Sequence, residues 1–146
     1  CGDDRLMKFI NIPSTQLLFQ PFVPYNLWGQ SIADNATIGL APLAGVYDMR
    51  RSWIKVIEYM LLKIPFVASK SLSYQELYQY GKFVNNDYLS WKNGILNIID
   101  NLKEKQQIAS KLPYEFAIKQ DINLHVNDIL NLYKTIAHKH AGITLV

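Results

Sequence analysis

The stretch RRSWIKVIEYMLLKIPFVAS, from Arg50 to Ser69, predicts a helix, a tight turn and a buried strand in succession. Successive helical residues advance by about 100°, which places an apolar arc towards the core. The residues of this arc are Trp53, Ile54, Val56, Ile57, Met60 and Leu61. Lys63 and Ile64 close the helix, since Pro65 lacks an N–H group and disfavours helical backbone before it. The run Pro65–Ala68 has no polar alternation, which is typical of a strand covered on both faces.

Charged side chains of the same helix fall on its other side. Arg51, Lys55 and Glu58 lie within a sector about 60° wide. A helix N-terminus carries free N–H groups and a positive dipole end, so Arg51, Ser52 and Lys55 would suit a phosphate or pyrophosphate. Glu58 could accept two hydrogen bonds from vicinal sugar hydroxyls. The alternative is a solvated face with a Lys55–Glu58 ion pair worth a few tenths of a kcal/mol.

Length and composition indicate one globular domain. The 146 residues are 49% hydrophobic and 18% charged, which suffices for a real core. The net charge of +3 favours an anionic ligand or an anionic membrane surface, and no basic run with interleaved aromatic residues indicates nucleic acid. Cys1 is the single cysteine and cannot form an internal disulfide. We expect a cytoplasmic protein, with a peripheral contact to the inner membrane face left open.

Short elements precede the central stretch. We expect a helix over Asp3–Ile10, a strand over Thr15–Phe19, a loop at Gln20–Pro24, a helix over Tyr25–Ala33 and a buried strand over Ala36–Ala41. The loop Pro42–Met49 leaves the carboxyl end of that strand, where ligands of open α/β sheets bind. In this loop Gly45 allows a sharp turn or a close approach to a ligand, and Asp48 either caps the helix or meets the ligand.

The pattern continues after the central strand. Ser73 is a suitable N-cap for a helix through Tyr80, Lys82–Val84 is a short strand, and Asp87 or Ser90 begins an amphipathic helix. Two further helices follow: Lys103–Lys119, which Pro113 should divide, and a last one from Asp121 to about His138. About five short strands alternating with helices predict an α/β fold with a mostly parallel sheet.

The histidines do not indicate a metal centre. His138 and His140 are two residues apart with no third ligand in view, and we expect them to be solvated. His125 alternates with apolar residues, and we interpret it as structural.

Three segments, taken in order, resemble the C-terminal domain of GT-B glycosyltransferases, and in particular the group-one type that uses nucleotide sugars. The segments are GLAPL at 39–43, RSWIKVIEYMLLKIPFVAS at 51–69 and YQELYQYGKFVNNDYLSW at 74–91. The family has a strand with an apolar-Pro-Leu turn and a basic-Ser-x-x-Lys-x-x-Glu-Tyr helix. These are followed by a Gly/Lys-Ile-Pro-x-Val-Ala-Ser strand and a later Gly-x-Leu/Phe-Val strand. The likeness covers most of the chain and implies a Rossmann-like parallel sheet flanked by helices, followed by C-terminal helices.

The resemblance also implies roles for individual residues. Glu58 would hold the ribose hydroxyls of the donor nucleotide. The residues near the donor diphosphate and sugar would be Arg51, Ser52, Lys55 and Asp48. Those near the base would be Phe22 and Val23. Many members carry a second carboxylate eight residues before the ribose-binding one, and this chain has Arg50 there.

The implied activity is glycosyl transfer from a nucleoside diphosphate sugar, such as a UDP-sugar or a GDP-sugar. We expect residues 1–146 to form a single donor domain that is truncated at its N-terminus. Its helix 121–140 would cross towards an N-terminal acceptor domain. In the family the catalytic Arg and Lys lie upstream of this region. No cofactor or metal is expected, because Arg51, Lys55 and the helix end supply positive charge. The alternative is a non-catalytic α/β interaction or regulatory domain of the same fold.

Overall fold

The computed structural model divides by its contacts into two compact units, Cys1–Ala36 and Thr37–Val146. The structure describes residues 11–48 and 50–141, and it describes the backbone alone for Ser14, Tyr47, Asp48, His140 and Ala141. The helix predicted over Asp3–Ile10 lies outside the described residues.

The described part of the first unit holds a 3-10 helix and an α-helix. The 3-10 helix η2 (Ser14–Gln16) stands where we predicted the start of a strand over Thr15–Phe19, so that prediction is wrong. The Gln16 amide donates to the Pro13 carbonyl at 2.8 Å, and this turn replaces the extended backbone that a strand needs. The helix α1 (Tyr25–Asn35) confirms the prediction for this segment.

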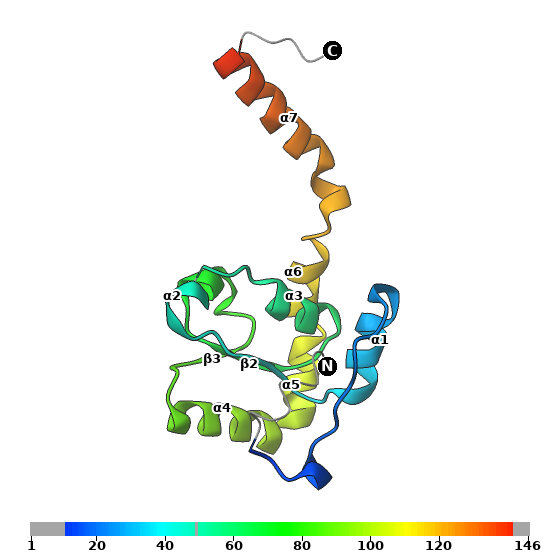
Figure 1. Cartoon of the computed structure of the whole chain (residues 1–146), viewed down its shortest axis with the longest axis vertical. Coiled ribbons are helices and arrows are strands. Elements are labelled where there is room, and N and C mark those ends of the chain that lie inside the picture. The colour runs from blue at the N-terminus through cyan, green and yellow to red at the C-terminus, as the bar shows by residue number, and fades with distance from the viewer. Residues whose placement is uncertain (1–10, 49, 142–146) are drawn as a thin grey trace. The chain divides into compact units, whose positions relative to one another are not determined.

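The second unit is built on a three-stranded parallel sheet (Figure 1). Its strands, in spatial order, are β1 (Gly39–Ala41), β2 (Phe66–Ser69) and β3 (Lys82–Val84). The α/β class and the parallel sheet are therefore confirmed, but the count of about five strands is wrong for the described residues. All of β2 is buried, as its unbroken apolar sequence predicts.

Short helices connect the strands. The loop predicted over Pro42–Met49 contains a one-turn helix, α2 (Gly45–Asp48), and α3 (Ile54–Leu61) follows it. Between β2 and β3 lies the 3-10 helix η3 (Leu72–Leu77), in place of the predicted α-helix from Ser73 to Tyr80. Its N-cap is Ser71, whose hydroxyl accepts a hydrogen bond from the Ser73 amide at 3.3 Å, so the predicted cap is two residues too late.

Helices make up the rest of the described chain. They are α4 (Tyr88–Asp100), α5 (Leu102–Ala109), α6 (Leu112–Ile118) and α7 (Ile122–Ala141). Asp87 caps α4 as predicted, since its carboxylate accepts a hydrogen bond from the Ser90 amide at 2.8 Å. The predicted division at Pro113 is also confirmed: the proline lies in the first turn of α6, where a missing N–H costs no helical bond.

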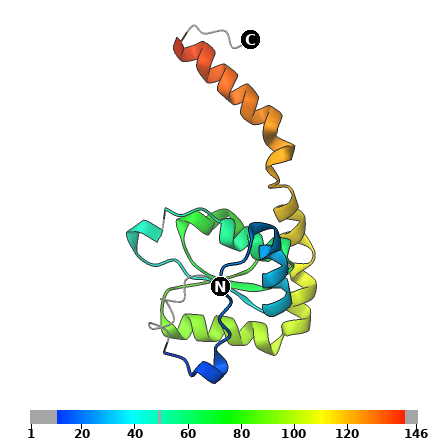
Figure 2. The same ribbon diagram turned by 45° about the vertical axis from the view of Figure 1, so that its right-hand side comes forward.

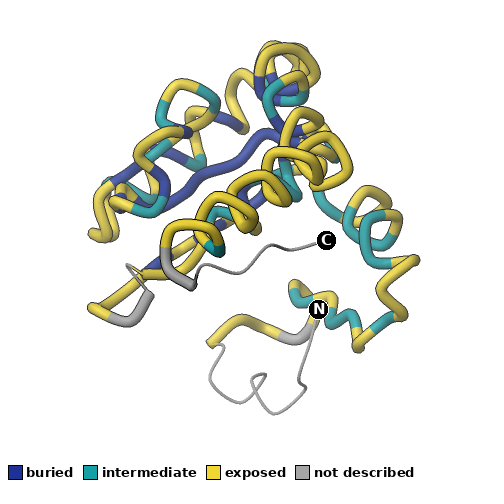
Figure 3. Tube along the Cα trace, turned by 90° about the horizontal axis from the view of Figure 1, so that it is seen from above, coloured by how far each residue is buried: buried dark blue, intermediate teal, exposed yellow. Residues whose placement is uncertain are grey.

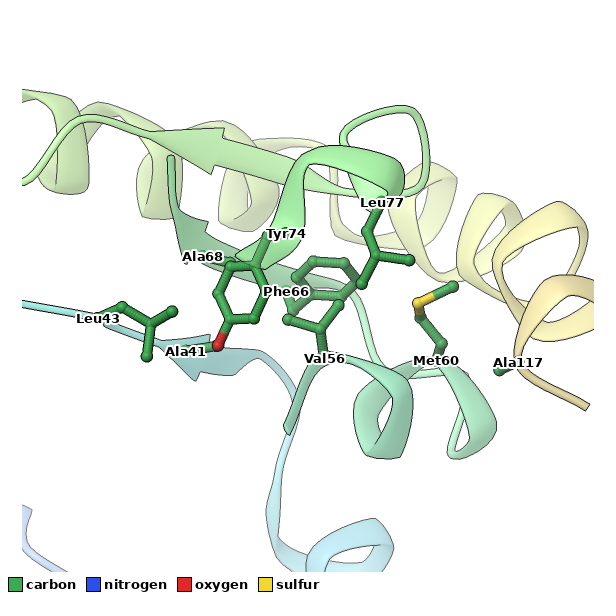
Figure 4. Packing of buried hydrophobic residues seen from close by; sticks show 9 residues of the cluster. All are labelled: Ala41, Leu43, Val56, Met60, Phe66, Ala68, Tyr74, Leu77 and Ala117. Carbon is green, nitrogen blue, oxygen red and sulfur yellow. The ribbon is translucent and has the colours of Figure 1, made fainter. Parts of the chain in front are cut away.

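Alternate residues of β2 face two apolar clusters, one on each side of the sheet. Phe66 and Ala68 belong to the larger cluster, which joins the sheet to α3, η3 and α6 (Figure 4). Val67 packs on the other side with Val84 and with Ile98 of α4. The longest buried stretch among the described residues is 64–69, which contains β2. Figure 3 shows that the helices are exposed over much of their length.

The helix α3 buries a narrower face than its sequence predicts. Val56 and Met60 are buried, but Ile54 and Leu61 are 61% and 42% exposed, so their predicted place in the core is wrong. The reason is tertiary: β1, β2, α6 and η3 pack on one side of α3 and leave these two residues uncovered. Beyond the helix, Lys63 adopts a left-handed backbone with φ 58° and turns the chain towards β2.

Candidate functional site

A hollow of about 430 Å³ opens at the carboxyl end of β1. Apolar residues of β1 and of the turn after it form part of its wall, and α3 with the residues before it forms another part. The polar side chains that line it are Arg51, Ser52, Lys55, Glu58, Tyr59 and Tyr74. The structure therefore brings four of the residues predicted for the site into one hollow.

The start of α3 differs from the expected geometry. The helix begins at Ile54 with Trp53 at the N-cap, so Arg51 and Ser52 precede the helix, and Lys55 lies in its first turn. Trp53 makes no side-chain cap bond; its ring packs edge-on against Phe116 of α6, with centroids 6.1 Å apart. Aromatic packing, rather than a polar cap, thus fixes the helix end that faces the hollow.

Lys55 and Glu58 form an ion pair in the lining of the hollow. The Lys55 Nζ lies 2.7 Å from the Glu58 Oε2, and the two side chains are 42% and 28% exposed. A pair this exposed contributes only about 0.3–0.5 kcal/mol, so a ligand could displace it at little cost. The solvated ion pair that we considered from the sequence is therefore present, and it lies in the hollow.

Tyr59 is a residue of the hollow that the sequence analysis did not single out. Its hydroxyl donates to the Leu40 carbonyl at 3.1 Å, and its ring stacks on Phe66. Burial raises the pKa of Tyr59 above its ordinary value of 10.0, although Lys55 partly opposes the rise, so the group stays a neutral donor at physiological pH. Gly39 admits this ring, because a Cβ there would lie 2.5 Å from it.

A polar network ties the carboxyl ends of all three strands together. At the end of β2 the Ser69 hydroxyl accepts from the Leu43 amide at 2.8 Å and donates to Asn86 Oδ1 at 2.6 Å. The Asn86 amide group donates in turn to the Leu43 carbonyl, and Trp91 of α4 donates to Asn86 at 3.3 Å. Leu43 follows β1 and Asn86 follows β3, so this network fixes the edge at which the hollow opens.

A second hollow of about 380 Å³ lies along the same edge and shares Leu43 with the first. Gly45, Lys70, Ser71 and Asn86 contribute to its lining. Gly45 has φ 79°, which confirms the sharp turn expected there, and a Cβ on it would meet nothing within 4 Å. The hydroxyl-rich loop after β2 is thus part of this edge.

For three predicted site residues, Asp48, Phe22 and Val23, a place at the hollow stays a prediction. The side chain of Asp48 lies outside the described residues. Phe22, which is 77% exposed, and Val23 belong to the first unit, whose placement relative to the second is not fixed.

Other expectations concern metals and membranes. Among the described residues, no group of three or more His, Cys, Asp or Glu side chains is arranged to hold a metal ion. His125 bonds locally, with its Nε2 2.7 Å from the Lys119 carbonyl oxygen. No described helix has the length and apolar character that crossing a bilayer requires.

Comparison of the chain with protein-family models, with curated proteins and with solved structures gives no match in any of the three. The interpretation of the hollow therefore rests on its own residues and geometry.

Proposed function

We propose that the chain is the donor-binding domain of a GT-B type glycosyltransferase and holds a nucleoside diphosphate sugar for transfer to an acceptor. One observation carries the proposal: Arg51, Ser52, Lys55 and Glu58 line a single hollow at the carboxyl end of a strand. In parallel α/β sheets this is the edge at which ligands bind. The volume of about 430 Å³ lies within the range of small-molecule sites.

The charges in the hollow suit the two ends of a nucleoside diphosphate. The guanidinium of Arg51 and the ammonium of Lys55 would pair with diphosphate oxygens and stabilise the charge that develops as the glycosyl group leaves. The carboxylate of Glu58 would accept hydrogen bonds from the two ribose hydroxyls. Lys55 would then exchange its bond to Glu58 for one to phosphate, while the Glu58 carboxylate would accept hydrogen bonds from the ribose in its place.

The arrangement of the sheet is consistent with a Rossmann-like domain. Three parallel strands follow the order β1-β2-β3, with α3 against one face and α4 against the other. Doubly covered parallel sheets of this kind are the usual setting for nucleotide sites. The Rossmann-like assignment is part of the proposal.

Calorimetric titration with UDP, GDP and ADP tests the proposal. We expect the native chain to bind at least one of them. Glu58→Ala should weaken that binding about tenfold or more, because a hydrogen bond to a charged group is worth about 1.5–3 kcal/mol. Glu76→Ala is the matched control, since Glu76 is exposed on η3 and lies outside the hollow.

The outcomes separate two failures. If none of the nucleotides binds the native chain at millimolar concentration, the donor-binding proposal is wrong. If a nucleotide binds native protein and Glu58→Ala with the same Kd, the hollow binds nucleotide in another way and Glu58 has no role in ribose recognition.

The second candidate is a non-catalytic interaction domain of the same α/β class. The Lys55–Glu58 ion pair favours it, because both charges are already paired within the hollow. In that case the native chain, Arg51→Ala and Glu58→Ala would all give the same nucleotide titration, with no binding. The hollow would then be a solvated surface.

A further inference from the structure

The last helix presents an apolar face that no described part of the second unit covers. Residues 121–136 of the chain are all exposed, and neither apolar cluster of the second unit includes a residue of α7. Figures 1 and 2 show α7 continuing from α6 and leading away from the sheet. A helix in water gains its stability mostly from packing its apolar face against another element. An exposed apolar face of this kind is therefore typical of an interaction site.

The apolar residues of α7 follow the spacing of a helix pair. Counting along the helix, steps of four and three residues alternate from Ile122 through Val126, Ile129 and Tyr133 to Ile136. This alternation is the a and d pattern of helices that pack side by side. Leu130 and Leu132 widen the apolar face, one on each side of it, and asparagines occupy much of the opposite side. The pattern covers nearly the whole helix.

The exposed area is enough for a dimer. Seven large apolar side chains of this face are between 38% and 65% exposed: Ile122, Val126, Ile129, Leu130, Leu132, Tyr133 and Ile136. At roughly 100 Å² each, two such faces would bury on the order of 1,400 Å², within the 1,200–2,000 Å² of stable protein interfaces. A second copy of the helix thus supplies both the shape and the area that are required.

The charges of α7 define the orientation of such a pair. Asp128, and Asp121 just before the helix, lie at its N-terminal half, whereas Lys134 and Lys139 lie in its C-terminal half. If the two helices lie side by side and antiparallel, the acidic half of each copy meets the basic half of the other. The two helix dipoles then point in opposite directions, which is favourable. A parallel pair would place like charges together.

We propose that two copies of this chain associate through α7, with the helices antiparallel and centred near Asn131. Ile129 of each copy then lies against Tyr133 of the other, and Val126 lies against Ile136. The proposal is independent of any ligand in the hollow, since it concerns only the surface of α7.

Sedimentation of the 146-residue chain over about 1 to 500 µM tests the association. The native chain should pass from monomer to dimer across this range. Ile129→Asp should remain monomeric throughout, because it places a charge at the centre of the contact. Asn127→Asp is the matched control, because it adds the same charge on the opposite side of the helix. We expect this variant to dimerise like the native chain. Both positions are exposed, so neither change disturbs the core of the second unit.

Disulfide trapping tests the orientation in a Cys1→Ser background. Val126→Cys and Ile136→Cys should form a covalent dimer when the two variants are mixed under mild oxidation, and neither should do so alone. A parallel pair gives the reverse result, because each position then faces its own copy, and this outcome overturns the orientation.

Two results overturn the association itself. The first is a native chain that stays monomeric up to the highest concentration. The second is a native chain that stays monomeric but co-sediments with vesicles of neutral and anionic lipids and loses this property in Ile129→Asp, which identifies a bilayer as the occupant of the face.

Discussion

Ser69 shows how one buried polar side chain defines an edge of the sheet. It is fully buried at the end of an otherwise apolar strand, yet both its hydrogen-bonding roles are used, towards Leu43 and Asn86. Its partners lie 26 and 17 residues away in the chain. The carboxyl ends of the three strands are therefore joined through Ser69 as well as through the direct bond from Asn86 to Leu43.

Replacing Ser69 by alanine should destabilise the second unit. The change leaves the Leu43 amide without its acceptor in a buried position, which costs about 1–3 kcal/mol. Urea unfolding measures the loss. Ser110→Ala is the control, because its hydroxyl bonds only to the exposed Gln107 carbonyl, and its expected cost is below about 0.5 kcal/mol. Equal midpoints for Ser69→Ala and native chain would contradict the structural role of the network.

Tyr59 should make the stability of the chain sensitive to alkaline pH. Its pKa in the folded state is raised by burial above 10.0. The stabilisation it provides is present below the unfolded-state pKa of about 10 and is lost as the pH rises through the folded-state pKa. We expect Tyr59→Phe to lower the free energy of unfolding at neutral pH by about 0.5–1.5 kcal/mol. Between neutral pH and about pH 11, the variant should lose less of its free energy of unfolding than the native chain loses.

Urea unfolding at the two pH values provides the measurement, with Tyr88→Phe, an exposed tyrosine outside the hollow, as the control. If the alkaline loss of stability is the same for Tyr59→Phe and the native chain, the buried hydroxyl is not its source.

At the scale of the element, α3 ends in a turn in which a lysine, Lys63, adopts the left-handed backbone that non-glycine residues disfavour. The Ile64 amide donates to the Tyr59 carbonyl at 2.9 Å and the Lys63 amide to that of Met60 at 3.1 Å. These two bonds form a Schellman motif, which requires a left-handed residue at the position of Lys63. The motif delivers Pro65 and β2 directly beneath the helix. Glycine would adopt this backbone without strain.

Relief of this backbone strain in Lys63→Gly should therefore contribute about 0.5–1 kcal/mol to the free energy of unfolding. The same change also removes the contact of Lys63 with Tyr114, which lowers the stability. The Lys63 ammonium lies 4.4 Å from the centre of that ring. Lys63→Ala is the matched comparison, because it removes the same contact but keeps the left-handed strain. Thermal unfolding of both variants should place Lys63→Gly above Lys63→Ala. The opposite order would show that the strain at this turn is negligible.

At the scale of the whole molecule, α7 and the sheet of the second unit should not unfold together. The sheet and its covering helices share continuous apolar clusters, whereas α7 belongs to neither cluster. A single helix of 20 residues is marginal in water without a partner. Cooperative unfolding requires shared contacts, so the two parts have different stabilities.

Low protein concentration makes this difference measurable, because the pairing of α7 is then weak. In a Trp28→Phe background, the fluorescence of Trp53 and Trp91 reports the two faces of the sheet. We expect the helical circular dichroism signal to fall first on heating, and the fluorescence to change later in one transition. Coincident curves would mean that α7 is part of the same cooperative unit.

The elements that could be predicted are those whose cause is local. The unbroken apolar run after Pro65 identifies β2, Asp87 identifies the start of α4, and Pro113 identifies the division between α5 and α6. The spacing of Lys55 and Glu58 likewise places them on one edge of α3, and both line the hollow. Arg51 lines it too, but it precedes the helix, so helical spacing does not account for its place. Chain geometry and side-chain chemistry within a few residues suffice for each of these.

The remainder depended on partners that are distant along the chain. Thr15–Phe19 has the composition of a strand, but in the structure a local turn replaces the ladder at its start. Ile54 and Leu61 are apolar but exposed, because what packs against a helix sets the width of its buried face. The bonds from Ser69 to Leu43 and Asn86 join three strand ends, and no pattern within one segment indicates them. Backbone preference acts over one or two turns, whereas burial and hydrogen-bond pairing arise only where separate segments meet.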